Sequence, residues 1–244
     1  MRNQNEKQPR KELKMAVIIS IETSTNVCSA SLSQDGRVLA SKENREGQNH
    51  AVLLGQYVKD LIEEADTRKL KLEAIAVSCG PGSYTGLRIG VSTAKGVCYG
   101  KDLKLISVST LKTMAKQVLR NNSVEDDAWL CPMIDARRME VYTTFLDKKL
   151  NEQKPISADI IDENSYAEIL SSKKVYAFGN GAEKCKNTLK SENLTYIDGI
   201  VPLASDMAEL AEEKFKKGEF EDVAYFEPYY LKEFVATQST KKLL

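Results

Sequence analysis

Histidine is almost absent from this chain of 244 residues, in which His50 is the only one. A Ser-His-Asp or Cys-His arrangement would depend on that residue alone, and it stands at the start of an amphipathic pattern with no nucleophile motif nearby. Metalloproteases of the H-E-x-x-H type need two histidines, so that class is excluded. We therefore expect no catalytic residue in this chain, and a capping or packing role for His50.

Other features that the sequence lacks exclude further classes. The five cysteines form no C-x-x-C pair, so a zinc site has almost no ligands and none is expected. Free thiols are typical of a reducing compartment, so we expect a cytoplasmic protein. No apolar run approaches the roughly 20 residues of a membrane helix. Basic and acidic residues both number 35, so no basic excess indicates a broad nucleic-acid-binding face.

A glycine-rich stretch from Gly80 to Gly90 is the most distinctive segment that the sequence does have. It contains four glycines in eleven residues, between an apolar run at 72–78 and small residues at helical spacing from Val91. Ser83 or Thr85 can cap the helix that follows. The pattern fits close packing of a small-residue helix face, a phosphate contact, or a purely structural turn. The Walker and Rossmann glycine patterns are both absent.

Hydrophobic periodicity predicts two α/β units. The first has strands at 17–21, 27–33, 37–42, 72–78 and 103–108, with helices at 49–66 and 86–100. Asp35-Gly36 is a hairpin signal between two of these strands. The order β-β-β-α-β-α-β is that of a ribonuclease H-like half-domain with a mixed sheet.

The second predicted unit repeats this mixture of elements. Strands are expected at 129–134, 140–146, 157–161 and 175–178, and helices at 111–119, 164–170, 182–189 and 204–217. We divide the chain into a disordered basic tail (1–14), a first domain (15–110), a second domain (111–222) and a C-terminal segment that docks back (223–244). The expected fold class is α/β, with mixed sheets and flanking helices.

Acidic side chains after two of the strands raise the alternative of an ATPase or kinase. Glu22 and Asp135 each follow the first strand of a unit, where carboxylates could hold magnesium. Neither is followed by the glycine that lets the backbone approach phosphate. A weak ATPase, a kinase or a nucleotide-binding regulator stays as the alternative function. The weak candidates for a nucleotide contact are Thr23, Ser24, Gly179 and Gly181.

Five segments, taken together, resemble the TsaB family (older name YeaZ). They are Ile21 to Thr25, Asn49-His50, Gly80 to Gly90, Ile134 to Tyr142 and Pro228 to Lys232. These matches occur in family order over nearly the whole chain from 15 to 232. The resemblance implies an actin-like two-lobed fold with degenerate nucleotide machinery. Two departures from the family pattern are the basic tail and Met139, where the family more often has glycine.

The resemblance also implies a function and partners. TsaB is the non-catalytic dimerisation subunit of a complex with TsaD and TsaE. The complex transfers a threonylcarbamoyl group from threonylcarbamoyl-AMP to N6 of the adenosine beside the anticodon in tRNAs that read A-starting codons. ATP or ADP and metal are expected on the partner subunit, no cofactor is expected on this chain, and tRNA is expected to be reached only through the complex.

The partner interface is predicted on two helices. Glycines four residues apart leave one face of helix 86–100 nearly bare, so another helix can approach closely. The apolar arc of helix 49–66 spans about 180°, wider than one packing surface of about 100° needs. Either TsaD or a second copy of the chain would use both helices, although the same stripes could instead face their own sheet. The predicted interface residues are Leu54, Tyr57, Val58, Leu61, Gly86, Gly90, Ala94 and Val97.

Overall fold

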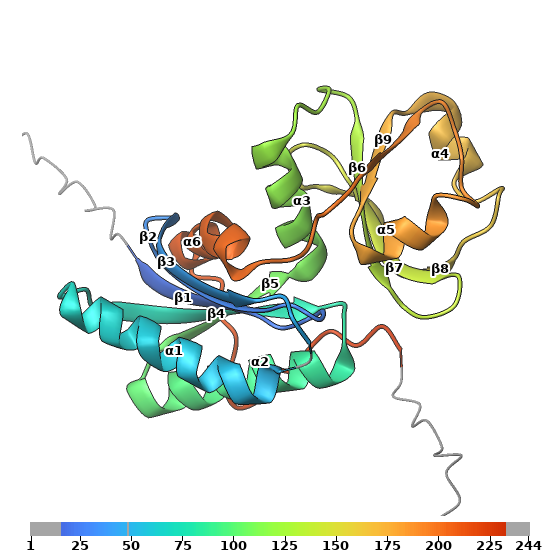
Figure 1. Ribbon diagram of the computed structural model, residues 1–244. Helices are drawn as coiled ribbons and strands as arrows, with labels where there is room; N and C mark the ends of the chain where they lie inside the picture. Colours follow the sequence, from blue (N-terminus) through green and yellow to red (C-terminus); the bar gives the residue numbers. More distant parts are fainter. Residues whose placement is uncertain (1–15, 48, 233–244) are drawn as a thin grey trace, which may run out of the picture.

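The computed structural model describes residues 16–47 and 49–232 and shows two lobes side by side (Figure 1). Each lobe is built on a five-stranded mixed sheet. The tail expected over residues 1–14 and the end of the chain from 233 lie outside the described residues. No helix in the described part is long and apolar enough to cross a membrane.

The sheet of the first lobe has the strand order β3-β2-β1-β4-β5. Its strands are β1 (Val17–Glu22), β2 (Cys28–Gln34), β3 (Arg37–Asn44), β4 (Leu72–Gly80) and β5 (Lys104–Ser109). The first three are antiparallel, and β4 and β5 join β1 in parallel. Asp35 and Gly36 both have positive φ, at 51° and 72°, as a tight hairpin turn requires.

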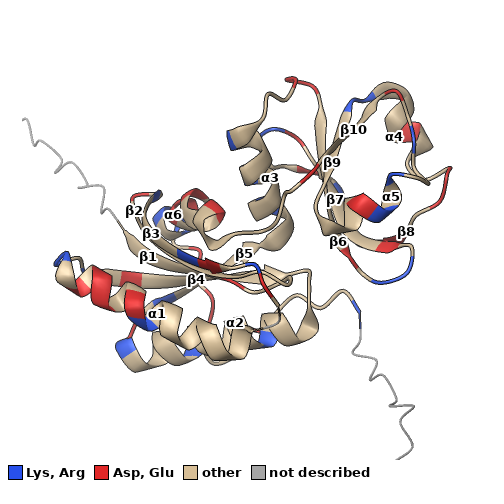
Figure 2. Ribbon diagram, viewed as in Figure 1, with Lys and Arg blue, Asp and Glu red and all other residues tan. Residues whose placement is uncertain are grey.

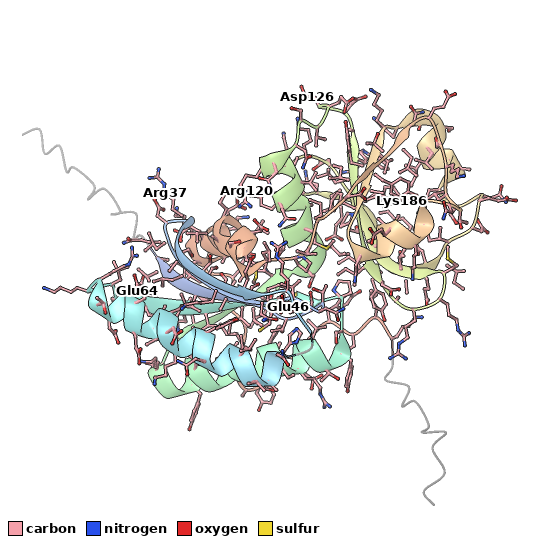
Figure 3. All side chains as sticks on the ribbon, in the orientation of Figure 1. Arg37, Glu46, Glu64, Arg120, Asp126 and Lys186 are labelled. Carbon is pink, nitrogen blue, oxygen red and sulfur yellow. The ribbon has the colours of Figure 1, made fainter. Side chains whose placement is uncertain are left out.

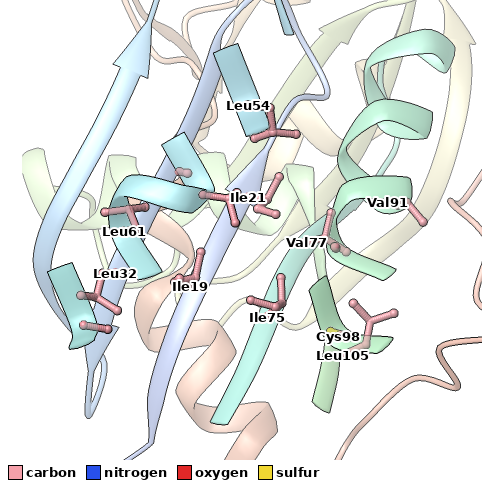
Figure 4. Packing of buried hydrophobic residues seen from close by; sticks show 14 of the residues in the cluster. Ile19, Ile21, Leu32, Leu54, Leu61, Ile75, Val77, Val91, Cys98 and Leu105 are labelled. Atoms are coloured by element: carbon pink, nitrogen blue, oxygen red, sulfur yellow. The ribbon is translucent and has the colours of Figure 1, made fainter. Parts of the chain in front are cut away.

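Two long helices, α1 (His50–Thr67) and α2 (Tyr84–Lys101), cover one face of this sheet. Their inward side chains meet alternate residues of the strands, which point to opposite faces of a sheet. Figure 4 shows this core, in which Leu54 and Leu61 of α1 and Val91 of α2 pack over Ile19 and Ile75. Apolar burial of this kind is the main stabilising contribution to the lobe.

The second lobe repeats the strand connectivity of the first. Its sheet has the order β10-β9-β6-β7-β8, with three antiparallel strands followed by two parallel ones. The elements are β6 (Trp129–Asp135), β7 (Glu140–Leu146), β8 (Glu152–Ile160), α4 (Ala167–Ser172), β9 (Val175–Phe178), α5 (Asn180–Cys185) and β10 (Leu194–Ile197). This duplication confirms the predicted two-lobed, actin-like α/β fold.

The last helix of each unit packs on the other unit. Helix α3 (Thr110–Asn121) lies on the sheet of the second lobe, where Leu111 and Met114 join its core. The short 3₁₀ helix η1 (Ala204–Met207) and α6 (Ala208–Lys217) return to the first lobe. Met207 and Ala211 pack against Ile18 and other residues on the face opposite α1 and α2. The predicted second domain, 111–222, is therefore wrong at its end, because 204–217 belongs to the core of the first lobe.

Polar contacts join the two exchanged helices. The carboxylate of Asp206 in η1 accepts a hydrogen bond from the Gln117 amide at 2.6 Å. Arg120, labelled beside α6 in Figure 3, places a guanidinium nitrogen 2.5 Å from the same carboxylate. Burial raises the pKa of Asp206, and the Arg120 charge and these hydrogen bonds oppose that shift. The lobes are therefore linked by paired polar groups as well as by packing.

The serine face of β2 is also buried, although serines that alternate with apolar residues are the pattern of a strand with one polar face. Ser29, Ser31 and Ser33 are each at most 3% exposed. The Ser29 hydroxyl accepts a hydrogen bond from the amide of Ala204 at 2.9 Å. Serines and apolar residues therefore do point to opposite faces of β2, but the serine face packs on η1 and is not exposed to water.

The C-terminal segment 223–232 lies against the first lobe. Val223 and Phe226 pack on the core beneath α2, and the Lys95 ammonium donates to the carbonyls of Ala224 and Phe226. The amide of Tyr229 then donates to the Cys79 carbonyl at 2.7 Å. These contacts bring the aromatic end of the segment to the junction of the lobes.

Candidate functional site

A cavity of about 650 Å³ lies between the lobes, at the carboxyl ends of the central parallel strands. In open α/β sheets this edge is where ligands bind. The loops after β1, β4 and β6 line it together with the C-terminal segment. The lining residues are Ser24 to Asn26, Pro81 to Thr85, Ile134 to Arg138, Glu140, Tyr142, Asn180 and Tyr229 to Lys232.

Within this site the glycine-rich loop packs on the loop after β1. The amide of Ser83 donates to the Ser24 carbonyl at 2.6 Å, and the Thr23 hydroxyl donates to the Gly86 carbonyl at 2.8 Å. A Cβ added at Gly86 would lie 2.1 Å from the Thr23 carbonyl oxygen, and one at Gly82 would lie 2.4 Å from that of Ser24. The glycines therefore bring two segments of the same chain together, and the space against their backbone is filled.

Most of the candidates for a nucleotide contact also pack against the protein's own chain. Thr23 is fully buried, and a Cβ at Gly179 or Gly181 would lie within 3 Å of the backbone of Met133 or Ile134. Of the four candidates only Ser24 lines the cavity. Thr23, Gly179 and Gly181 pack against the protein's own chain and do not line this cavity, so their role as nucleotide contacts stays a prediction.

Glu22 also faces the protein interior. It is fully buried, and its carboxylate accepts a hydrogen bond from the Ser24 amide at 2.6 Å. Burial raises the pKa of this carboxyl, although bonds from Ser24, Ser78 and Thr23 oppose the shift. A carboxyl inside the lobe, outside the cavity lining, is not placed to hold a metal ion in the cavity.

Asp135, by contrast, is exposed at the cavity and engaged by its neighbours. Its carboxylate accepts from the Arg137 amide at 2.9 Å and from the Lys184 ammonium. The Asn180 side chain accepts from its amide at 3.0 Å. Within residues 16–47 and 49–232, no cluster of three histidine, cysteine or acidic side chains is arranged to hold a metal ion. The two acids thus do not form a pair open to the cleft.

The exposed parts of the cavity are aromatic and basic. The rings of Tyr84 and Tyr230 lie 4.6 Å apart, and the Arg88 guanidinium sits 4.9 Å from the centre of the Tyr84 ring. Arg137 and Arg138 both have positive φ, at 72° and 49°, a conformation that side chains rarely adopt. In the sequence these residues stand out only as motif matches, since no periodicity indicates that they meet across the lobes.

His50 holds the loop after β1 in place. Its Nε2 atom lies 2.9 Å from the Thr25 carbonyl oxygen, and the residue is 5% exposed. Asn49 precedes α1 and makes no side-chain hydrogen bond to it, so its side chain does not cap this helix. Ser83 does cap α2, through a bond from the Gly86 amide at 3.3 Å.

The predicted partner interface lies on the right helices, but most of its residues point inward. Gly86 and Gly90 are buried against Thr23, and Ala94 is fully buried against the sheet. On α1, Leu54, Val58 and Leu61 are at most 2% exposed. These six residues form the core of the lobe and cannot contact a partner. Only Tyr57 and Val97 stay half-buried at the surface.

The outer faces of α1 and α2 carry exposed apolar and small residues. Val52 is 77% and Tyr99 87% exposed. No atom lies within 4 Å of the position that a Cβ would take at Gly55, Gly96 or Gly100. Figure 2 shows that the first half of α1 and most of α2 lack charged residues. We call these exposed residues together, Val52 and Gly55 on α1 and Gly96, Tyr99 and Gly100 on α2, the helix face.

Comparisons with known proteins agree on a tRNA-modification family. The family model described as "TsaD: tRNA N6-adenosine threonylcarbamoyltransferase" matches residues 38–239. The Escherichia coli "tRNA threonylcarbamoyladenosine biosynthesis protein TsaB" is 32% identical over 90% of this chain and 96% of its own length. The Bacillus subtilis protein of the same name is 36% identical over 52% of this chain and 53% of its own length.

A solved structure shows the same fold. It is described as an uncharacterized Pseudomonas aeruginosa protein with similarity to peptidase YEAZ. It has a TM-score of 0.77 and 24% identity, and the match covers 89% of this chain and all of that one. The chain belongs to the family of that TsaD model and, within it, groups with the TsaB proteins of tRNA threonylcarbamoyladenosine biosynthesis.

Proposed function

We propose that this chain is the non-catalytic dimerisation subunit of a tRNA threonylcarbamoyltransferase complex. The complex transfers the threonylcarbamoyl group of threonylcarbamoyl-AMP to N6 of the adenosine beside the anticodon, in tRNAs that read A-starting codons. The catalytic partner is TsaD, which holds the nucleotide and the metal, and TsaE completes the assembly. The place of action is the cytoplasm, where thiols like the five free cysteines stay reduced.

The observation that supports the docking role is the open space beside Gly55 and Gly96. Each glycine in a helix interior costs about 1 kcal/mol relative to alanine. Gly86 and Gly90 are required because Thr23 lies against them. Gly55 and Gly96 have no such neighbour within the chain, so nothing in the monomer explains why a destabilising glycine stands at these two positions. Close approach of a partner helix would explain both glycines.

The occupant that we propose for the helix face is TsaD. Val52 and Tyr99 would enter the contact as exposed apolar side chains, with the glycines between them allowing two helices of the partner to approach. A seam of two helices from each side gains dispersion contacts along its length. A second copy of this chain could use the same face, so a homodimer and the heterodimer should compete.

The proposed absence of catalysis is supported by the two loops that pack on each other and leave no space for phosphates. The two segments that would carry phosphates in an ATPase, 22–26 and 80–86, are hydrogen-bonded to each other. Glu22 is inside the lobe with a raised pKa, and Asp135 is bound by its own neighbours. We therefore place the chemistry on TsaD and expect tRNA to be modified only by the complex.

Gly96→Gln tests the docking role without weakening the monomer. Glutamine has a higher helix propensity than glycine, so the variant monomer should melt at or above the wild-type temperature. Its side chain fills the open space, so binding to purified TsaD should weaken at least tenfold, measured by calorimetry. Normal binding by a folded Gly96→Gln variant would show that the helix face is not the interface.

The matched control is Gly218→Gln, which also fills open space beside a glycine. Gly218 lies at the end of α6, away from the helix face, and has no atom within 4 Å of its Cβ position. Its φ of +73° makes the substitution strained, so the control monomer should be slightly destabilised. Binding to TsaD should nevertheless stay at the wild-type level, since the interface is untouched.

A further inference from the structure

A second cavity, of about 430 Å³, is lined by six lysines. It lies between α3, α6 and the turn that joins β7 to β8, so both lobes contribute to it. Its volume is within the range of ligand sites in proteins. The lysines are Lys112, Lys116, Lys148, Lys149, Lys214 and Lys217. We call this cavity the lysine pocket.

The lining of the lysine pocket is more cationic than the chain as a whole, whose net charge is zero. Two acidic residues, Glu213 and Glu219, line it with the six lysines, and three further carboxylates beside the pocket pair with three of those lysines, which leaves one excess positive charge. Clefts lined by one sign of charge focus the field and raise the local concentration of oppositely charged ligands. The first turn of α3 also borders the pocket, and the positive end of a helix dipole favours anions.

Three of the six lysines are paired with acidic side chains. Lys112 pairs with Glu152 at 3.2 Å, Lys116 with Glu209 at 2.6 Å and Lys148 with Asp126 at 2.9 Å. These pairs are partly exposed, and ion pairs of that kind are weak enough for a phosphate to replace the carboxylate.

The other three lysines are Lys149, Lys214 and Lys217. None has a carboxylate oxygen within 4 Å among the residues that the structure describes. Lys214 donates only to the Ser107 hydroxyl, at 3.4 Å. The pocket therefore holds unneutralised charge that a bound anion would meet.

We propose that the lysine pocket binds the phosphodiester backbone of RNA. Lysine is a flexible point charge that holds phosphate without a fixed fork geometry. Cations on two helices and a turn can contact successive phosphates of one strand. RNA is the polyanion to which we commit because the curated relatives act in the biosynthesis of a tRNA nucleoside. This inference goes beyond the docking role and uses none of the residues of the helix face.

The test is direct binding of the full chain alone to a fluorescein-labelled tRNA transcript, followed by anisotropy from 50 to 200 mM salt. The variant K149E/K217E reverses two exposed, unpaired lysines. We expect its affinity at 50 mM salt to fall at least tenfold. Each lost phosphate contact lowers the slope of log K against log salt by about 0.7–0.9, so the slope should fall by about 1.4–1.8.

The matched control is K71E/K190E, which makes the same change in net charge at two exposed lysines outside the pocket. We expect its affinity to stay within threefold of wild type. A neutral variant, K149Q/K217Q, keeps the test valid if the charge reversal unfolds, and its salt slope should fall by the same amount.

Three results would overturn the proposal. The wild-type chain would show no binding to the transcript at 50 mM salt. Alternatively, the pocket and control variants would lose the same affinity, which would show that net charge alone governs binding. Finally, polyglutamate would displace the transcript at equal charge concentration, which would assign the pocket to acidic polypeptides. Because TsaD is absent from the assay, each result is independent of the docking role.

Discussion

The same substitution, glycine to alanine, should have opposite effects at two positions of α2. At Gly96 the added methyl group enters open space, so the variant gains only helix propensity. At Gly86 it would lie 2.1 Å from the Thr23 carbonyl oxygen, a backbone atom that cannot rotate away. Ordinary contact begins near 3.4 Å, so the two segments must separate by more than 1 Å.

The expected magnitudes follow from these surroundings. Gly96→Ala should stabilise the chain by about 1 kcal/mol, the difference in helix propensity. Gly86→Ala forces an overpacked contact, which costs about 1–3 kcal/mol and occasionally more. In a chain of this size 1 kcal/mol corresponds to about 2–4 °C in melting temperature. The two variants should therefore melt about 4–16 °C apart, on either side of wild type.

Circular dichroism melts of the two purified monomers, at equal concentration and far below the dissociation constant of any dimer, measure this difference. The wild-type chain and Gly100→Ala, a third position with open space, serve as references. The reasoning is refuted if Gly86→Ala melts with the wild type, because the loop 22–26 would then not press on α2. It is equally refuted if Gly96→Ala melts below wild type, because the outer face would then be packed within the monomer.

Four further predictions follow from the same structure. Ala94→Leu should destabilise the monomer by about 1–3 kcal/mol in urea unfolding, because it overpacks a fully buried site, and Val58→Arg should destabilise it further, because it buries a charge; retention of wild-type stability would contradict this. The stability of Glu22→Gln should rise relative to that of wild type as pH rises from 5 to 8. Because the pKa of the Glu22 carboxyl is raised in the folded state, this carboxyl stabilises the wild-type fold fully below its unfolded pKa of about 4.5, and that stabilisation is lost as pH rises through the folded pKa. An equal difference at both pH values would refute it. His50→Gln should leave tRNA modification by the reconstituted complex largely intact while costing about 1 kcal/mol of stability through the lost bond to Thr25; loss of several orders of magnitude in rate with the complex still assembled would show a chemical role. The chain alone should not hydrolyse ATP, and magnesium-dependent turnover near ~1 s⁻¹ that Glu22→Ala abolishes would overturn that expectation.

Local signals in the sequence were sufficient for most of the fold. The hairpin at Asp35-Gly36, the strand Val175–Phe178 and the strand Glu140–Leu146 were predicted at or near their observed bounds. Strand β10 was missed: it is as short as β9, but Leu194–Ile197 includes a threonine and is only partly buried, so it does not stand out as an apolar run. The helix 204–217 was found but assigned to the wrong lobe, since chain order does not reveal which sheet a helix returns to.

The site was harder to predict because small residues on a helix allow close packing either within the chain or against a partner. Small residues on α2 predict close approach, and the sequence does not say whether the approaching segment is internal. Gly86 and Gly90 meet Thr23 of the same chain, whereas Gly96 meets nothing within it. The lysine pocket had no sequence signal at all, because its cations are spread from Lys112 to Lys217 and balanced elsewhere. Only folding brings them to one cavity.

The return of α6 means that the first lobe does not exist as an uninterrupted piece of the gene, whereas the second lobe is continuous from α3 to β10. A fragment ending at residue 110 would lack α6, and Ile18, Ile106 and Val108 would face solvent on an uncovered sheet. A fragment beginning at residue 122 would lack α3 and uncover the second sheet in the same way. The first lobe must therefore wait for residues 204–217 to be synthesised before its core closes. Fragments that end near residue 110 should aggregate, whereas co-expressed halves cut in the loop at 122–128 have every helix needed to reassemble.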